Sequence, residues 1–227
     1  MEIYLNEVSD LPAFNYFEKN YKVIENIGNG SYGKVLKCLE LQSHTIVAVK
    51  IIDTSKFSNK KLNIIKTEYE ILETLHHPNI VKFRNFFECN EKYYIVMNFI
   101  QSGSLNKLIF DRKESKSNLI SILNLIILID PITEEEASKI IKSILNAIDY
   151  IHSNNIIHRD LKPDNIMIQN MDDLSSICLI DFGLSIINFD TFENDYCGTL
   201  KFMAPELIDK KFYNKVNSTS SNIIINL

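Results

Sequence analysis

The first hundred residues carry apolar side chains in patterns that are typical of strands. Residues 45–52 form a run rich in β-branched side chains, which favours a buried strand. Residues 21–24 lead into a glycine-rich turn and residues 34–37 lead out of it, so we expect a hairpin there. Residues 93–97 have the same β-type composition. The pattern therefore predicts a β-rich first region.

A helical spacing of apolar residues appears once inside this region and dominates after it. Residues 62–75 carry apolar side chains three and four positions apart, which predicts one helix among the strands. Beyond residue 99, residues 104–110 are a short helix candidate. Thr133, followed three residues later by Glu136, has the pattern of a capping box and predicts a helix that runs to about residue 152.

Composition and charge narrow the class of protein. The chain has 227 residues, of which 45% are hydrophobic and 23% charged, as in ordinary soluble globular proteins. The net charge of −5 argues against a general nucleic-acid-binding protein, which usually has a basic face. The most apolar stretch, residues 119–129, is shorter than the roughly 20 residues of a membrane-spanning helix.

Cysteine spacing and the first residues indicate the compartment. The four cysteines have no Cys-x-x-Cys spacing and are too few for a disulfide scaffold, so we expect reduced thiols. The N-terminus lacks a basic segment followed by an apolar one, which is the pattern of a secretory signal. We therefore expect a cytoplasmic or nuclear location.

The turn of the predicted hairpin contains three glycines at the spacing G-x-G-x-x-G, namely Gly28, Gly30 and Gly33. Without a Cβ, glycine lets a backbone approach phosphate oxygens closely. The same spacing also occurs in plain glycine-rich turns and in dinucleotide-binding folds, where a helix follows. Here β-type sequence follows, which favours the hairpin form.

Two charged residues of this region form a candidate pair. Lys50 ends the apolar run Val47-Ala48-Val49 within the predicted strand at 45–52, and Glu68 lies on the predicted helix that follows. A lysine at the end of a strand is usually solvated, but it can also place a cation beside phosphates. If Lys50 is buried it needs a partner, and Glu68 is a sensible one.

A short polar loop, residues 158–165, combines an acid, a base and an amide between apolar runs. Asp160 can accept a proton from a hydroxyl, and Asn165 can bind a hard metal ion through oxygen. Asp181 follows an apolar strand and lies two residues before Gly183. Alone it indicates a turn; together with Asn165 it indicates a magnesium site. The alternative for residues 158–165 is a polar surface loop.

These motifs occur together in the order and spacing of protein kinases. From about residue 21 to about residue 208 the chain resembles the eukaryotic protein serine/threonine kinase family, and within it the calcium/calmodulin-dependent or calcium-dependent protein kinase-like group. The resemblance implies an α+β, two-lobed fold, with a β-rich N-lobe and a mainly helical C-lobe. It also implies ATP and Mg²⁺ as cofactors and proteins as substrates.

The resemblance implies catalytic roles for five residues. Asp160 would orient the substrate hydroxyl as the catalytic base. Lys162 would neutralise charge on the transferring γ-phosphoryl group, and its presence indicates serine/threonine specificity. Lys50, steadied by Glu68, would hold the α- and β-phosphates. Thr199 would bridge Asp160 and Lys162.

Metal and nucleotide contacts are implied in the same way. Asn165 and Asp181 would bind the two Mg²⁺ ions. Met97 occupies the gatekeeper position and Asn98 follows it in the hinge, whose contacts to adenine are mostly made by the backbone. The residues expected to contact ATP are Ile27, Gly28, Asn29, Gly30, Ser31, Tyr32, Gly33, Val35, Ala48, Lys50, Met97 and Met167.

The resemblance also divides the chain. It places an N-terminal extension at residues 1–20, the N-lobe at 21–98 and a partial C-lobe at 99–208. The tail at residues 209–227 diverges from the family: residues 217–222 are polar and of low complexity, and the family's next buried helix and its Trp are absent. We therefore expect a C-terminally truncated kinase with an incomplete C-lobe and a disordered tail.

The catalytic set, the missing C-lobe helices and an insertion near residues 113–130 leave three readings of the function open. The complete catalytic set favours an active kinase, whereas the missing helices favour an inactive fragment that binds nucleotide or a protein partner. A third reading is an interaction module built around the apolar run at residues 119–129. That run packs on the lobe, meets a partner, or is translated non-coding sequence.

Overall fold

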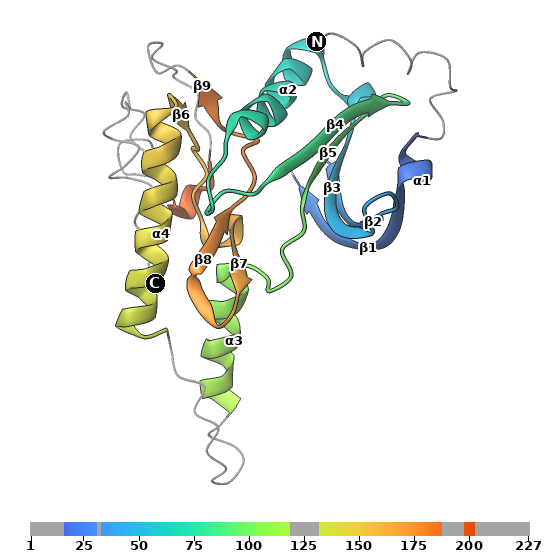
Figure 1. Ribbon diagram of the computed structural model, residues 1–227. Coiled ribbons are helices and arrows are strands. Elements are labelled where there is room, and N and C mark those ends of the chain that lie inside the picture. The colour runs from blue at the N-terminus through green and yellow to red at the C-terminus, as the bar shows by residue number, and fades with distance from the viewer. Residues whose placement is uncertain (1–15, 31–32, 119–131, 188–197, 203–227) are drawn as a thin grey trace. The chain divides into compact units, whose positions relative to one another are not determined.

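The computed structural model describes residues 16–30, 33–118, 132–187 and 198–202 (Figure 1). They fall into two compact units, one of Met1–Leu62 with Phe83–Phe99 and the other of Asn63–Lys82 with Ile100–Leu227. Several predictions made above lie outside the described residues, namely those for Ser31, Tyr32, 119–129 and 209–227.

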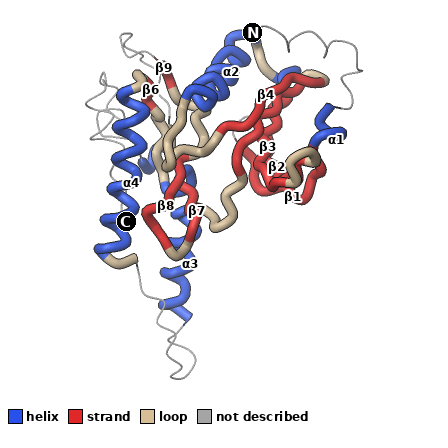
Figure 2. Tube along the Cα trace, viewed as in Figure 1, coloured by secondary structure: helices blue, strands red, loops and turns tan. Residues whose placement is uncertain are grey.

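The first unit contains a five-stranded antiparallel sheet, drawn in red in Figure 2. Its strand order is β1-β2-β3-β5-β4. The strands are β1 (Tyr21–Gly30), β2 (Gly33–Glu40), β3 (Thr45–Asp53), β4 (Phe83–Cys89) and β5 (Lys92–Asn98). The predicted hairpin is confirmed as β1 and β2, and the predicted strands at 45–52 and 93–97 are confirmed as β3 and β5.

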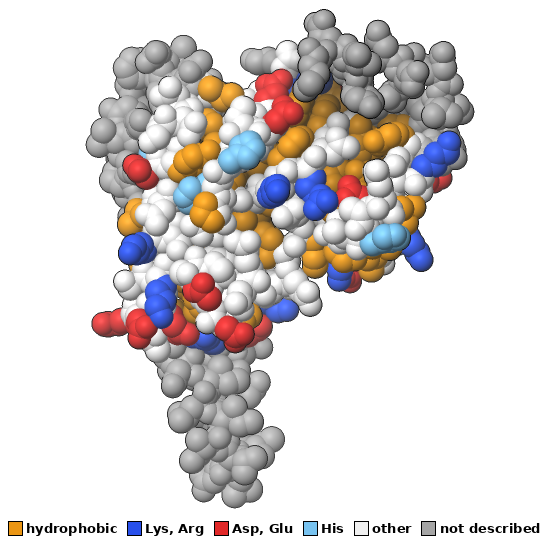
Figure 3. Space-filling model, in the orientation of Figure 1, with side chains coloured by type: hydrophobic (Ala, Val, Ile, Leu, Met, Phe, Trp, Pro, Cys, Tyr) orange, Lys and Arg blue, Asp and Glu red, His pale blue; other side chains and the backbone are white. Residues whose placement is uncertain are grey.

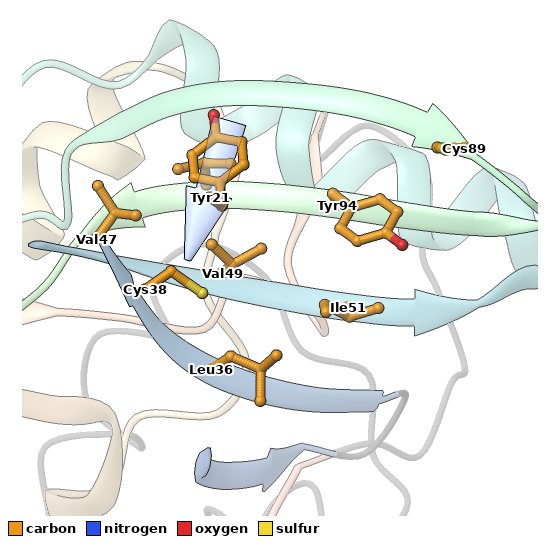
Figure 4. Packing of buried hydrophobic residues seen from close by; sticks show 9 residues of the cluster. Tyr21, Leu36, Cys38, Val47, Val49, Ile51, Cys89 and Tyr94 are labelled. Atoms are coloured by element: carbon orange, nitrogen blue, oxygen red, sulfur yellow. The ribbon is translucent and has the colours of Figure 1, made fainter. Parts of the chain in front are cut away.

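One face of this sheet holds the hydrophobic core of the unit (Figure 4). Alternate residues of a strand point to opposite faces, so β3 contributes Val47, Val49 and Ile51 to it. The short helix α1 (Tyr16–Asn20) adds the Phe17 ring, whose centroid lies 5.0 Å from that of Tyr94. These aromatic contacts join the chain before β1 to the sheet.

The second unit is mainly helical and carries two short antiparallel strand pairs. Helix α2 (Asn59–Thr74) starts in the first unit and continues into the second. The other elements are α3 (Leu105–Asn118), α4 (Glu134–Ser153), β6 (Ile156–Ile157) paired with β9 (Ile186–Ile187), and β7 (Ile166–Asn170) paired with β8 (Asp173–Leu179). Single turns of 3₁₀ helix lie at Pro163–Asn165 and Leu200–Phe202.

Helix α4 begins at the capping box that the sequence predicts. The Thr133 hydroxyl accepts from the backbone N–H of Glu136, and the Glu136 carboxylate accepts from that of Thr133. Arg112 on α3 donates two hydrogen bonds to the same carboxylate, at 2.8 and 3.0 Å. The hydrogen bonds from Arg112, and to a smaller extent the one from the Thr133 backbone, lower the pKa of Glu136 to about 2.

The segment between α2 and β4 is joined to β8 by hydrogen bonds. The Asn79 side-chain amide donates to the carbonyl oxygens of Ser175 and Ile177, at 3.2 and 2.8 Å. The Asn79 carbonyl accepts from the Leu179 N–H, and the Leu179 carbonyl accepts from the Val81 N–H. These hydrogen bonds hold β8, the strand that leads into Asp181, against the segment at 76–82.

The surface of the described residues mixes charged and apolar side chains (Figure 3). Apolar side chains that reach solvent include Val23, Ile24 and Ile27 of β1. Within the part of the chain that the structure describes, no helix is both long and apolar enough to cross a membrane.

Candidate active site

The loop between β6 and β7 places Asp160 among four hydrogen-bond donors. Its Oδ2 accepts from Lys162 Nζ at 2.6 Å and from Asn165 Nδ2 at 3.0 Å. Its Oδ1 accepts from the Thr199 backbone N–H at 3.0 Å and from the Thr199 hydroxyl at 2.7 Å. Only 9% of the residue is exposed, and these four hydrogen bonds satisfy the buried carboxylate and hold it in one orientation.

Thr199 closes a ring of contacts with the acid and the lysine. Lys162 Nζ donates to Thr199 Oγ1 at 2.9 Å as well as to Asp160. The bridge that the resemblance implies for Thr199 is therefore present. The part of each residue in catalysis stays a prediction.

Asn165 is buried and is oriented from several sides. Its amide nitrogen donates to both the backbone oxygen and the Oδ2 of Asp160, and its backbone carbonyl accepts from the Ile180 N–H. Because the amide nitrogen is committed to Asp160, the amide oxygen is the atom that can bind a cation. This matches the ligand chemistry of Mg²⁺, which takes oxygen ligands.

His158 links the two loops that carry the acidic residues. Its Nδ1 accepts from the Asp160 N–H at 3.3 Å, so Nε2 carries the proton and donates to the Ile180 carbonyl at 3.2 Å. Its ring packs against Phe182, with centroids 4.8 Å apart. Burial lowers the pKa of His158 and favours this neutral form. The motif at 158–165 by itself predicts no role for His158, although the place of this residue in the loop is a usable signal.

Asp181 and Arg159 have backbone angles that non-glycine residues rarely adopt. Their φ values are +64° and +65°. Such left-handed conformations cost free energy and persist where the surrounding contacts impose them. Arg159 is held by its Nε, which donates to the Leu184 carbonyl at 2.6 Å. The strain therefore falls on the two loops that His158 connects.

The predicted nucleotide residues of the first unit lie on the sheet and the hairpin. In the register of β2, β3 and β5, Val35 pairs with Lys50 and Ala48 pairs with Met97. Directly opposed residues share a face of the sheet. Ile27, Gly28 and Asn29 lie on β1, which ends at Gly30.

The glycines of the hairpin differ in their surroundings. A Cβ on Gly28 would meet nothing within 4 Å, so this glycine leaves open space above the strand. A Cβ on Gly33 would overlap the Ile51 carbonyl oxygen of the neighbouring strand. Gly33 is therefore required for close approach of β2 to β3, a packing role that the spacing of the motif did not reveal.

Lys50 and Glu68 are both buried, with exposed fractions of 6% and 2%. Lys50 lies on β3 in the first unit, and Glu68 lies on α2 in the second. Met167 lies on β7, opposite Cys178 of β8. The structure thus brings together Asp160, Lys162, Asn165 and Thr199, while the pairing of Lys50 with Glu68 stays a prediction.

Comparison with known proteins identifies the family. The sequence model of the family described as the protein kinase domain matches residues 21–223 of this chain. Similar proteins include the calcium/calmodulin-dependent protein kinase type 1 of Macrobrachium nipponense, 32% identical over 87% of this chain and 52% of the relative. Calcium-dependent protein kinase 5 of Plasmodium berghei is 34% identical over 92% of this chain and 34% of the relative. Serine/threonine-protein kinase RAD53 of Saccharomyces cerevisiae is 35% identical over 85% of this chain and 21% of the relative.

The chain thus spans between about a fifth and about half of the length of these relatives. The family match, the five-stranded sheet and the helical second unit confirm the predicted α+β, kinase-like fold with a β-rich first lobe. This chain belongs to the protein kinase domain family.

Proposed function

We propose that this chain is a protein serine/threonine kinase that transfers the γ-phosphoryl group of ATP to serine and threonine hydroxyls of protein substrates. The observation that carries the proposal is the environment of Asp160. Lys162, Asn165 and Thr199 all donate to its carboxylate. Phosphoryl transfer depends mainly on positioning and charge neutralisation, and this arrangement supplies both.

The residues of the loop divide the work between them. Asp160 accepts a hydrogen bond from the substrate hydroxyl and so orients the attacking oxygen. Lys162 Nζ lies 2.6 Å from Asp160 Oδ2, where its cation would neutralise charge on the transferring γ-phosphoryl group. The buried His158 keeps the backbone of the loop in place through the Asp160 N–H.

Mg²⁺ and ATP fit the chemistry of the residues present. The amide oxygen of Asn165 and the carboxylate of Asp181 are the oxygen ligands that Mg²⁺ prefers, and Mg²⁺ needs only one or two protein ligands beside phosphate. Among the described residues no three His, Cys, Asp or Glu side chains gather into a metal site. When bound, Mg²⁺ neutralises phosphate charge and orients the phosphates.

The substrate class rests on Lys162. A lysine two residues after the catalytic Asp is the pattern of serine/threonine kinases, and it contacts Thr199 here. Relatives with serine/threonine or calcium-dependent kinase names support the same class.

The test is transfer of phosphate from ATP to a generic serine/threonine peptide in the presence of Mg²⁺. The full chain is compared with Asp160→Asn, which should lower transfer to background, and with Asp172→Asn, the same chemical change at an exposed turn. Asp172→Asn should leave the rate unchanged. Transfer by the full chain that does not exceed that of Asp160→Asn would refute the proposal. Nucleotide binding without transfer would favour an inactive, nucleotide-binding protein instead.

A further inference from the structure

Strand β5 ends where the family resemblance places the contacts to adenine. Met97 is paired with Ala48 on β3 and with Phe83 on β4, and Asn98, the last residue of the strand, is paired with Val47. Phe99 then leaves the strand. Successive residues of an extended chain point to opposite faces, so Asn98 and Phe99 are accessible to different neighbours.

Arg84 contacts Asn98 on the face that carries Val47. It lies at the register shift between Phe83 and Asn85 of β4. Its Nη1 donates to Asn98 Oδ1 at 3.3 Å, and its Nη2 donates to Glu40 Oε2 at 2.9 Å. The guanidinium thus joins the end of β5 to the end of β2.

Glu40 is itself held in place. Its carboxylate accepts from the Ser43 hydroxyl and from the Thr45 hydroxyl. The hydrogen bond from Ser43 and the charge of Arg84 hold the pKa of Glu40 below its usual value. The carboxylate therefore stays charged at neutral pH and keeps Arg84 in position. The Arg84 and Glu40 side chains are 29% and 18% exposed.

Lys37 contacts Phe99 on the other face. Its Nζ lies 4.9 Å from the centre of the Phe99 ring and 2.9 Å from Glu25 Oε1. Lys37 is opposed by Ala48 in the sheet, so it shares a face with one of the residues expected to contact adenine. A cation over an aromatic ring is attracted by its π electrons.

We propose that Arg84 and Lys37 are positioning residues for nucleotide binding, which fix Asn98 and Phe99 from opposite faces of the sheet. The inference rests on the proposed function. Arg84 is paired with Glu40 and Lys37 with Glu25, so each ion pair is close to neutral. Each pair therefore acts mainly by holding its neighbour in position, and only weakly through its charge. A lone exposed ion pair contributes little. Here two ion pairs contact the consecutive residues Asn98 and Phe99, at the point where the backbone pairing of β5 ends.

The test uses Arg84→Met and Lys37→Met, with Lys92→Met as the matched control. Lys92 is an exposed cation at the opposite end of β5. The dissociation constant of a non-hydrolysable ATP analogue is measured by calorimetry, beside that of Mg²⁺-tripolyphosphate. Arg84→Met and Lys37→Met should each weaken the analogue about 3- to 10-fold and leave tripolyphosphate within about twofold. Lys92→Met should change neither.

Kinetics supply the second readout. The KM for ATP should rise with the dissociation constant, while kcat at saturating ATP and the KM for the peptide stay within about twofold. Arg84→Lys, which keeps the charge but not the two-pronged geometry, should restore only part of the affinity.

Three outcomes separate this inference from the proposed function. If the unsubstituted chain binds the analogue but transfers no phosphate, the proposed function fails and the dissociation constants still decide the inference. If the variants bind the analogue as tightly as Lys92→Met, or lose tripolyphosphate equally, the inference is wrong and the proposed function stands. If the unsubstituted chain binds no nucleotide, both are wrong.

Discussion

Thr199 offers a direct test of how the candidate site works. Thr199→Val replaces the hydroxyl by a methyl group of similar size. It removes the hydrogen bond to Asp160 Oδ1 at 2.7 Å and the one from Lys162 at 2.9 Å. The backbone N–H of residue 199 still donates to Asp160. The substitution thus leaves the chain path in place and removes only the side-chain bridge.

The size of the effect follows from these two contacts. A hydrogen bond to a charged group contributes about 1.5–3 kcal/mol. Both partners of Thr199 are charged, but Lys162 is 21% exposed and water replaces part of its lost contact. We therefore expect a net loss of about 1.5–3 kcal/mol in transition-state stabilisation, which is about a 10- to 160-fold fall in kcat/KM.

Steady-state transfer to a serine/threonine peptide measures this loss, and Thr199→Ser is the matched control because it keeps the hydroxyl. Thr199→Ser should retain activity within about threefold, a difference of less than 1 kcal/mol. Equal activity of Thr199→Val and the unsubstituted chain would show that the bridge has no part in catalysis. Equal loss in Thr199→Ser and Thr199→Val would show that the side chain acts by shape and not through its hydroxyl.

Three further predictions concern the scaffold. Glu136→Gln keeps an oxygen for the capping box but removes the charge that faces Arg112, so urea unfolding should give a free energy about 1 kcal/mol lower. Because the pKa of Glu136 is about 2 in the fold, below its usual value of 4.5, the difference should be full above pH 4.5 and vanish as the pH falls to about 2; a pH-independent difference would refute the reasoning. Burial lowers the pKa of His158, so its contribution to the free energy of unfolding should be complete above pH about 6.5 and fall at lower pH by at most about 1.4 kcal/mol per pH unit. His158→Asn should therefore make the free energy of unfolding depend less on pH between pH 5 and 7, and an unchanged pH dependence would contradict the burial argument. Asn79→Ala leaves two carbonyl oxygens of β8 without their donor and should cost about 1–3 kcal/mol in the same assay, whereas a neutral effect would show that water replaces the amide.

Features whose causes are local could be predicted from the sequence. The start of α4 depends on Thr133 and Glu136, which are three residues apart and determine each other's hydrogen bonds. Strand β3 depends on a run of β-branched residues, which favour the extended chain whatever lies beside them. In both cases the residues that determine the element lie within it or next to it in the sequence.

Features that depend on distant residues were not visible in the pattern. Strand β4 shows no clean alternation, because its side chains are mostly half-buried. The packing of Phe17 depends on Tyr94, and the placing of the 76–82 segment depends on Asn79 reaching β8. The spacing of the glycines predicts a phosphate-binding role for Gly33, whereas the Ile51 carbonyl oxygen across the sheet gives the stronger steric reason for a glycine.

The carboxylate of Asp160 is held both by residues near to it in the sequence and by one distant residue. Lys162 and Asn165 are two and five residues away in the sequence, so the loop itself brings two donors to the carboxylate. The other two come from Thr199, 39 residues away. Loss of the distant contacts would leave Asp160 oriented by Lys162 and Asn165, but without the bridge to the segment at 198–202. Activity should therefore decline in steps as contacts are removed, with Thr199→Val between the unsubstituted chain and Asp160→Asn, because the two sets of donors reach the same carboxylate from independent parts of the chain.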